Sequence, residues 1–295
     1  MRLSTTTALM GRTRSGVYPS YIESMAACRE AGFRVQDLNL CSIGGGETQL
    51  SGDNWREEAE KIAVEAERIG VVFGQSHPVF VGFNLENETD EKQKEWHDMM
   101  TRSIEISSIL DVEWAVLHPF GVHNGHDVDI DASIKLNMEC YDFAFELAYK
   151  LGVKLAYENM PLRWGGSRRF TNYAEDLIAL VDEYKSPNVG ICWDFGHGNI
   201  IYKDQLPALR KMGKRLKMTH VADNYGKGDD HTNPFHGTTD WYSIMPVLRE
   251  IGYTGDFAFE THMETAYVPE ELRAGIAKET YRLGQYLMSL AGYDV

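Results

Sequence analysis

Short apolar or β-branched runs recur along the chain and alternate with segments of helical period. The runs are Leu3–Leu9, Arg34–Leu40, Val71–Ser76, Glu113–Leu117, Val153–Tyr157, Val189–Trp193, Leu216–Val221 and Asp256–Phe259. Between them, apolar residues recur every three or four positions, as in Asn54–Ile69 and Ile134–Leu151. That spacing is typical of helices with one buried face. The alternation predicts an α/β fold of the (β/α)₈ TIM barrel type, with eight strands and helices between them.

Glycine marks the return from several predicted helices to the next strand. Gly32, Gly70, Gly152 and Gly252 occupy such positions, and glycine readily adopts the left-handed turn that ends a helix. An open doubly wound sheet alternates in the same way, but no Gly-x-Gly-x-x-Gly follows the first predicted strand. No linker or low-complexity tract interrupts the pattern, so residues 1–295 are predicted to form a single domain.

Composition narrows the classes of partner. The 295 residues are 43% hydrophobic and 25% charged, which is typical of a folded domain, and the net charge is −15. Such a charge repels polyanions, so no nucleic-acid partner is expected. Residues 1–11 lack the apolar core of a signal peptide, and no apolar run is long enough for a membrane span. A cytoplasmic protein is therefore expected. Its widely spaced cysteines are interpreted as reduced thiols.

Four polar residues each lie one position from the end of a strand run. They are Glu158, Asp194, His220 and Glu260. Because side chains alternate along a strand, Glu158 shares a face with Ala156, and Glu260 shares one with Ala258. Small neighbours are typical of a barrel interior, so all four side chains are predicted to converge at its carboxyl end. Buried carboxylates need a compensating partner, and three of them beside one imidazole predict a divalent metal site. Oxygen-rich ligands favour Mn²⁺, with Mg²⁺, Co²⁺ or Zn²⁺ as alternatives.

Five further candidates come from the same predicted end of the barrel. They are His77, His118, His197, Asp229 and His231. These side chains could hold additional ions. Neutral imidazoles that bind substrate hydroxyl groups are the alternative. His197 is interpreted as a substrate contact, and the number of ions stays open at this point.

Several motifs together resemble those of the xylose isomerase-like barrel superfamily. They are Tyr157-Glu158-Asn159, Trp193-Asp194-Phe195-Gly196-His197, His220-Val221-Ala222-Asp223 with a downstream Asp-x-His, and Phe259-Glu260-Thr261. The superfamily includes sugar isomerases, ketose 3-epimerases, inosose dehydratases and isomerases, hydroxypyruvate isomerases and endonuclease IV. The resemblance spans nearly the whole chain.

The ketose 3-epimerase branch implies specific roles. By that resemblance, Glu158, Asp194, His220 and Glu260 bind one Mn²⁺-like ion, and Glu158 and Glu260 also serve as the acid/base pair. The leading hypothesis is a metal-dependent isomerase or epimerase of a sugar, cyclitol or keto-sugar, acting through an enediolate. Related barrels imply a homodimer or homotetramer. The expected substrate contacts are His197, His118, His77, His231, Asp229, Trp193 and Arg163.

Three alternatives remain. A dehydratase of the keto-inositol type would share the deprotonation and then eliminate water. By resemblance to endonuclease IV, all nine candidate ligands match a trinuclear zinc site, which implies an abasic-site nuclease. The sequence Asp223-Asn224-Tyr225-Gly226 departs from the 3-epimerase pattern, which argues against a 3-epimerase of free ketoses and keeps these alternatives open. A non-catalytic sugar-binding barrel is the third alternative.

Cationic and aromatic residues near the predicted site have two interpretations. Arg163, Arg168 and Arg169 follow the fifth predicted strand and could bind a phosphorylated or carboxylated substrate; a solvated loop is the alternative. Aromatic residues could form the wall of a sugar pocket or simply pack in the core. These are Phe80, Phe83, Phe120, Trp164, Trp193, Phe235 and Trp241.

Overall fold

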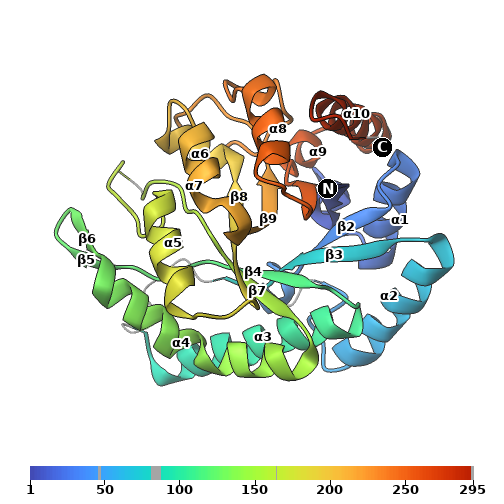
Figure 1. The fold of residues 1–295 in the computed structure, drawn as a ribbon. Coiled ribbons are helices and arrows are strands. Elements are labelled where there is room, and N and C mark those ends of the chain that lie inside the picture. The colour runs from blue at the N-terminus through green and yellow to red at the C-terminus, as the bar shows by residue number, and fades with distance from the viewer. Residues whose placement is uncertain (46–47, 81–87, 164, 294–295) are drawn as a thin grey trace.

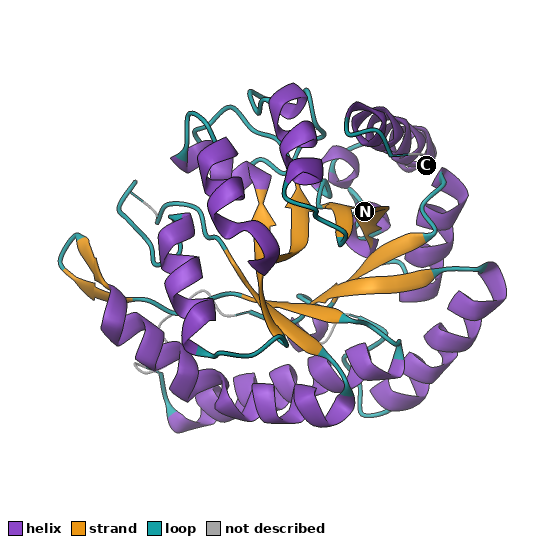
Figure 2. Cartoon of the chain, viewed as in Figure 1, coloured by secondary structure: helices purple, strands orange, loops and turns teal. Residues whose placement is uncertain are grey.

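Eight parallel strands form a closed barrel surrounded by helices (Figures 1 and 2). The structure is a computed structural model and describes residues 1–45, 48–80, 88–163 and 165–293. Around the barrel the strands follow the order β1-β10-β9-β8-β7-β4-β3-β2. They are β1 (Arg2–Thr6), β2 (Val35–Asn39), β3 (Val72–His77), β4 (Trp114–Leu117), β7 (Lys154–Glu158), β8 (Val189–Asp194), β9 (Leu216–Val221) and β10 (Asp256–Phe259). The predicted (β/α)₈ fold is confirmed.

Helices connect successive strands and cover the outside of the barrel (Figure 2). They are α1 (Tyr21–Ala31), α2 (Trp55–Ile69), α3 (Asp90–Ile109), α4 (Ile130–Leu151), α5 (Ala174–Glu183), α6 (Phe195–Ile201), α7 (Leu206–Met212), α8 (Trp241–Glu250), α9 (Met263–Ala266) and α10 (Glu270–Leu290). A small antiparallel hairpin, β5 (Val122–Asn124) with β6 (Asp127–Asp129), lies outside the barrel between β4 and α4. Helix α10 packs against α1 and α8, which closes the ring of helices (Figure 1).

The first predicted strand, Leu3–Leu9, was too long. Strand β1 ends at Thr6, and residues Thr7–Met10 form a short 3₁₀ helix. The Thr6 hydroxyl accepts a hydrogen bond from the backbone N–H of Ala8, so the polar side chain caps the helix instead of continuing the strand. The other seven predicted strands agree with the structure to within one residue at either end.

The apolar core is divided into two parts by the barrel wall. Inside the barrel, Trp114, Val116, Ala156, Cys192 and Met218 form a small cluster of their own. Outward-facing strand residues join the larger cluster between the barrel and the helices. Side chains at alternate strand positions therefore face opposite layers, as the sequence pattern predicts.

Local capping groups define the ends of several helices. Gly70 and Gly152 end α2 and α4 in the left-handed conformation, with φ of 70° and 78°. Asp240 caps α8 by accepting a hydrogen bond from the backbone N–H of Ser243.

In the described ranges, no helix is long and apolar enough to cross a membrane. All four cysteines are free thiols.

Candidate active site

The carboxyl ends of the strands open into a cavity of about 1200 Å³. Its lining includes both predicted acid/base residues and most of the predicted substrate contacts. These are Glu158, Glu260, His77, His118, His197, Asp229, His231 and Arg163. His220 and Asp194 are buried beneath this lining. The structure thus brings all four predicted metal ligands to one end of the barrel, on the adjacent strands β7, β8 and β9 and just after β10.

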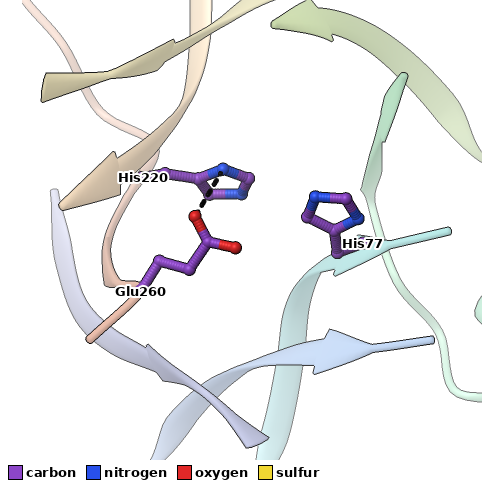
Figure 3. Close-up of side chains that lie close together, drawn as sticks. All are labelled: His77, His220 and Glu260. Atoms are coloured by element: carbon purple, nitrogen blue, oxygen red, sulfur yellow. Dashed lines mark ion pairs between the residues drawn. The ribbon is translucent and has the colours of Figure 1, made fainter. Parts of the chain in front are cut away.

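His220 lies between the two glutamates. Its Nδ1 is 2.7 Å from Glu158 Oε1 and 3.4 Å from Glu260 Oε2. The His77 ring faces the His220 ring, with centroids 5.5 Å apart and planes only 12° from parallel. Figure 3 shows His77, His220 and Glu260 directed toward a common space at the end of the barrel.

Asp194 is held on the same side of the barrel by backbone geometry. It pairs with His220 in the register between β8 and β9. Its Oδ1 caps α6 by accepting a 2.6 Å hydrogen bond from the backbone N–H of His197. The Asn159 side chain binds both the N–H and the carbonyl of Asp194, at 2.6 and 2.9 Å. Asn159 therefore ties the end of β7 to the end of β8, a positioning role that sequence reasoning missed.

A second group of ligand atoms surrounds the other oxygen of Glu158. His118 Nε2 lies 3.0 Å from Glu158 Oε2 and 3.2 Å from His77 Nε2. The His77 Nδ1 contacts the Pro78 carbonyl at 3.0 Å and the Cys41 thiol at 3.2 Å. These contacts hold the His77 ring with its Nε2 facing His118 and Glu158. His77, His118 and Glu158 could therefore hold a cation together.

A third group of ligand atoms lies above α6. Asp229 Oδ2 is 3.1 Å from His197 Nε2 and 3.1 Å from His231 Nε2. The opposite nitrogens are occupied, because His197 Nδ1 contacts the Asn159 carbonyl and His231 Nδ1 contacts the Glu260 carbonyl. The three side chains could therefore also bind one ion.

The loop that carries Asp229 and His231 is held by the buried carboxylate of Asp223. Asp223 Oδ1 accepts from the backbone N–H groups of Asn224 and Thr239. Its Oδ2 accepts from the backbone N–H of Phe235 and the indole N–H of Trp241. The local backbone pairs Asp223 with Thr232. Asp223 therefore ties the backbone of this loop to the first residue of α8.

The electrostatics of the two glutamates differ. Burial tends to raise the pKa of Glu158, but His220 and His118 outweigh it and hold that pKa well below its usual range. Burial raises the pKa of Glu260, and the nearby histidines only partly oppose the shift. The same carboxylates, with Cys192, hold the pKa of His220 well above its usual value despite the effect of burial. The two carboxyl groups thus occupy different environments within one site.

The donor set fits a divalent cation. Asp194 Oδ2 is buried and has no hydrogen-bond partner among the described residues. The two oxygens of Glu158 are also buried and face only imidazole nitrogens, at distances of 2.7 to 4.0 Å. Buried polar atoms are normally satisfied, so such a concentration at the end of the barrel indicates a missing partner. Several carboxylate oxygens and imidazole nitrogens within reach of one another provide ligands for a divalent ion.

Two further residues of the site were not predicted. Asp37 on β2 is buried, and its Oδ2 lies 3.4 Å from His220 Nε2 and accepts a 2.8 Å hydrogen bond from Gln75. The His262 ring lies against the His231 ring, with centroids 4.5 Å apart and planes tilted by 40°, and burial lowers the pKa of His262 to about 3. The sequence signal that could have identified Asp37 is a carboxylate in the middle of a predicted strand. The signal for His262 is its position two residues after Glu260.

Trp193 was wrongly predicted as a substrate contact. It is completely buried and donates a 2.9 Å hydrogen bond from its indole N–H to Gln205. Strand alternation places Trp193 opposite to Asp194, so it packs in the layer between barrel and helices. Of the other aromatic candidates, Phe80 and Phe120 line the cavity.

Trp241 and Phe235 do not line the cavity. Trp241 packs in the outer core, and Phe235 lies against Tyr242 and Tyr286. Phe83 and Trp164 lie outside the described residues.

Comparisons with known proteins agree with this architecture. The sequence profile of the xylose isomerase-like TIM barrel family matches residues 25–282. An 89-residue segment is 34% identical to a D-psicose 3-epimerase of Enterocloster bolteae and covers 30% of this chain and 28% of that protein. The matched segments span between 28% and 62% of the lengths of the curated relatives.

Two solved structures share the fold over nearly the whole chain. A D-psicose 3-epimerase crystallised in the presence of D-fructose has a TM-score of 0.74 and 17% identity, with 99% of this chain and 100% of the other covered. The IolI protein with a bound zinc atom also has a TM-score of 0.74 and 17% identity, covering 99% and 98%. Together with the profile match over residues 25–282, these similarities show that the chain belongs to the xylose isomerase-like TIM barrel family.

Proposed function

We propose that the protein is a divalent-metal-dependent isomerase or epimerase of a sugar or keto-sugar. The observation that supports this most strongly is the convergence of Glu158, His220 and Glu260 at the floor of the cavity. Beside them, Asp194 Oδ2 is buried and lacks a hydrogen-bond partner among the described residues. Two carboxylates near one cation site are the groups needed to move a proton on a carbon beside a carbonyl.

Glu158, Asp194, His220 and Glu260 would hold the metal. A bound divalent ion polarises a carbonyl oxygen and stabilises the negative charge that develops when the neighbouring C–H bond is broken. Glu158, held ionised by two histidines, removes the proton, and Glu260 returns one from its own side of the site. His197, His118, His77, His231 and Asp229 surround this position and bind the hydroxyl groups of the substrate.

The similarities support the proposed substrate class and the metal. The Enterocloster relative is a D-psicose 3-epimerase, and the IolI structure contains zinc. Among metals, the carboxylate-rich set favours Mn²⁺, and the surrounding histidines are compatible with Zn²⁺. We further propose a cytoplasmic homo-oligomer, as expected for barrels of this kind. A dehydratase would use the same proton removal but give a product 18 mass units lighter, the mass of one water.

The test is hydrogen exchange with solvent. Metal-loaded protein is incubated in D₂O with D-fructose, D-psicose and their 6-phosphates, and deuterium beside the carbonyl is followed by NMR and mass spectrometry. The wild type should incorporate deuterium, and Glu158→Gln should slow incorporation by roughly 10²- to 10⁴-fold. The thermal unfolding curves of the wild type and the variant are compared to verify that the variant is folded. Exchange at the wild-type rate in Glu158→Gln would exclude Glu158 as the base.

A second candidate function is favoured by the two additional ligand groups. His77 and His118 lie beside Glu158, and Asp229 bridges two further histidines, so the site has the donors for more than one ion. Several ions near one carboxylate are typical of phosphodiester hydrolysis. Metal analysis of protein purified without added metal, combined with cleavage of an abasic-site duplex at low salt, distinguishes this candidate. One ion per chain and no cleavage would reject it.

A further inference from the structure

The loop between β7 and α5 carries three arginines with different environments. Arg168 forms hydrogen bonds of 2.8 and 3.0 Å with both oxygens of Asp176 and lies over the Tyr173 ring. This ion pair joins the loop to the first turn of α5. Arg168 therefore has a structural partner, in contrast to Arg163 and Arg169.

Arg163 and Arg169 both line the cavity. Among the described residues, no carboxylate lies within 4.0 Å of either guanidinium. Elsewhere on the surface, cations are commonly paired, as in Arg210 with Glu250 and Arg215 with Asp182. The sequence contains 44 acidic and only 29 basic residues, so acidic partners are abundant. Arg163 and Arg169 therefore bring two cations that have no carboxylate partner among the described residues into the lining of one cavity.

Arg163 and Arg169 share the lining of the cavity with Glu158 and His118. Burial lowers the pKa of Arg169, the positive charge of Arg163 lowers it further, and the charge of Glu158 opposes both effects. Arg169 also acts on His118 through its charge. Arg169 is half-buried and belongs to the same cavity lining as Glu158, so one ligand in the cavity can face both residues.

His123 completes the cationic group. Burial lowers its pKa, and Arg163 and Arg169 lower it further. Its Nε2 is 3.1 Å from the place that a Cβ atom on Gly121 would occupy, and Phe170 Cβ is 2.9 Å from the same place. The imidazole is thus packed over a glycine beside Phe170, the residue after Arg169. A neutral imidazole here can donate one hydrogen bond to an anion without adding to the repulsion.

We propose that Arg163, Arg169 and His123 form an anion subsite that binds a carboxylate or phosphate group of the substrate, at the end remote from the reacting carbons. Guanidinium groups bind both anions through paired, charge-assisted hydrogen bonds. An anion there relieves the repulsion between the two arginines. The inference rests on the proposed function and narrows its substrate class to acidic keto-sugars.

The chain offers a matched control on the other side of the cavity. Arg12 also lines the cavity and lies over the Tyr18 ring. It follows β1, which is separated from β7 by half the barrel. Arg12 therefore has the same charge and the same general exposure to a ligand, but it is remote from the subsite.

The test measures binding to the metal-loaded protein by isothermal titration calorimetry. The probes are D-fructose, D-fructose 6-phosphate and D-fructuronate, which differ at carbon 6. The wild type should bind at least one anionic probe more tightly than D-fructose. The double variant Arg163→Gln/Arg169→Gln should bind that anionic probe roughly 10- to 100-fold more weakly. Its affinity for D-fructose should change little. Arg12→Gln should leave all three affinities unchanged.

The pattern of outcomes identifies the anion and separates the two proposals. A loss confined to the 6-phosphate assigns the subsite to phosphate, and a loss confined to D-fructuronate assigns it to carboxylate. Equal binding of all three probes by the wild type, no binding of either anionic probe, or an equal effect of Arg12→Gln would overturn the subsite. Metal content and thermal unfolding verify that the double variant is folded. If the wild type binds an anionic probe more tightly than D-fructose but catalyses no deuterium exchange, the proposed reaction is rejected and the anion subsite is retained.

Discussion

The two ends of the barrel both contain buried carboxylates, but they neutralise them differently. At the amino end, Asp256 at the start of β10 is paired with Arg2 at the start of β1, through contacts of 2.6 and 3.0 Å. At the carboxyl end, Glu158, Asp194 and Glu260 face histidines, and no arginine or lysine of the described residues forms an ion pair with them.

The comparison distinguishes an ion pair that stabilises the fold from a group of residues that is arranged to bind an ion or a ligand. The Arg2–Asp256 pair satisfies its charges within the fold, and Gly74 leaves room for it. The carboxyl end instead leaves Asp194 Oδ2 buried without a hydrogen-bond partner among the described residues, and Glu158 faces only histidines. Because the uncompensated burial of a charge costs several kcal/mol, a fold retains such an arrangement where a ligand or ion supplies the missing interaction.

The largest effect is expected from removing the metal, which acts on the carboxyl end alone. Dialysis against a chelator should abolish deuterium exchange and lower the melting temperature. At a metal concentration 100-fold above the dissociation constant, the lost stabilisation is about 2.7 kcal/mol. Calorimetry and the exchange assay measure both effects, and added Mn²⁺ or Zn²⁺ should restore them. Full activity in metal-free protein would contradict the proposed site.

The next largest effect is expected from Asp37→Asn, which removes the charge beneath His220. Asp37 Oδ2 lies 3.4 Å from His220 Nε2 and positions that ring. The variant should bind metal roughly 10- to 100-fold more weakly, as is typical when the partner of a ligating histidine is lost. Asp256→Asn is the matched control, because it removes a buried carboxylate at the other end. Equal metal affinities for wild type and Asp37→Asn would show that Asp37 has no positioning role.

The smallest effect on activity is expected from Gly74→Ala at the amino end. A Cβ atom on Gly74 would lie 1.8 Å from Asp256 Oδ2 and 2.6 Å from Arg2 Nη2. The ion pair must shift, which should reduce the free energy of unfolding by about 1–3 kcal/mol while metal affinity is retained. Denaturant unfolding measures the change.

Gly275→Ala in α10 is the control for Gly74→Ala. A Cβ atom there would meet no atom within 4 Å, so this variant should be neutral or slightly stabilising. A loss of metal binding in Gly74→Ala would show that the two ends of the barrel are coupled.

Strand alternation predicted much of the barrel but failed where the strand is irregular. Between Gln36 and Asp37 the pairing of β2 with β3 shifts its register, and both residues are buried. A simple two-residue period therefore cannot assign Asp37 to the interior. The same period, applied consistently, places Trp193 opposite to Asp194. Its assignment to the substrate was an error of interpretation rather than a limit of the sequence.

The sequence by itself determined the eightfold alternation and the positions of Glu158, Asp194, His220 and Glu260 at the strand ends. Those features depend on local period and on the common direction of parallel strands. Only the tertiary structure decided that Asp37 lies beneath His220, that Asp229 lies between two histidines, and that Arg168 is paired while Arg169 borders the cavity. These relations join distant segments, and closure of the barrel fixes the distances between them.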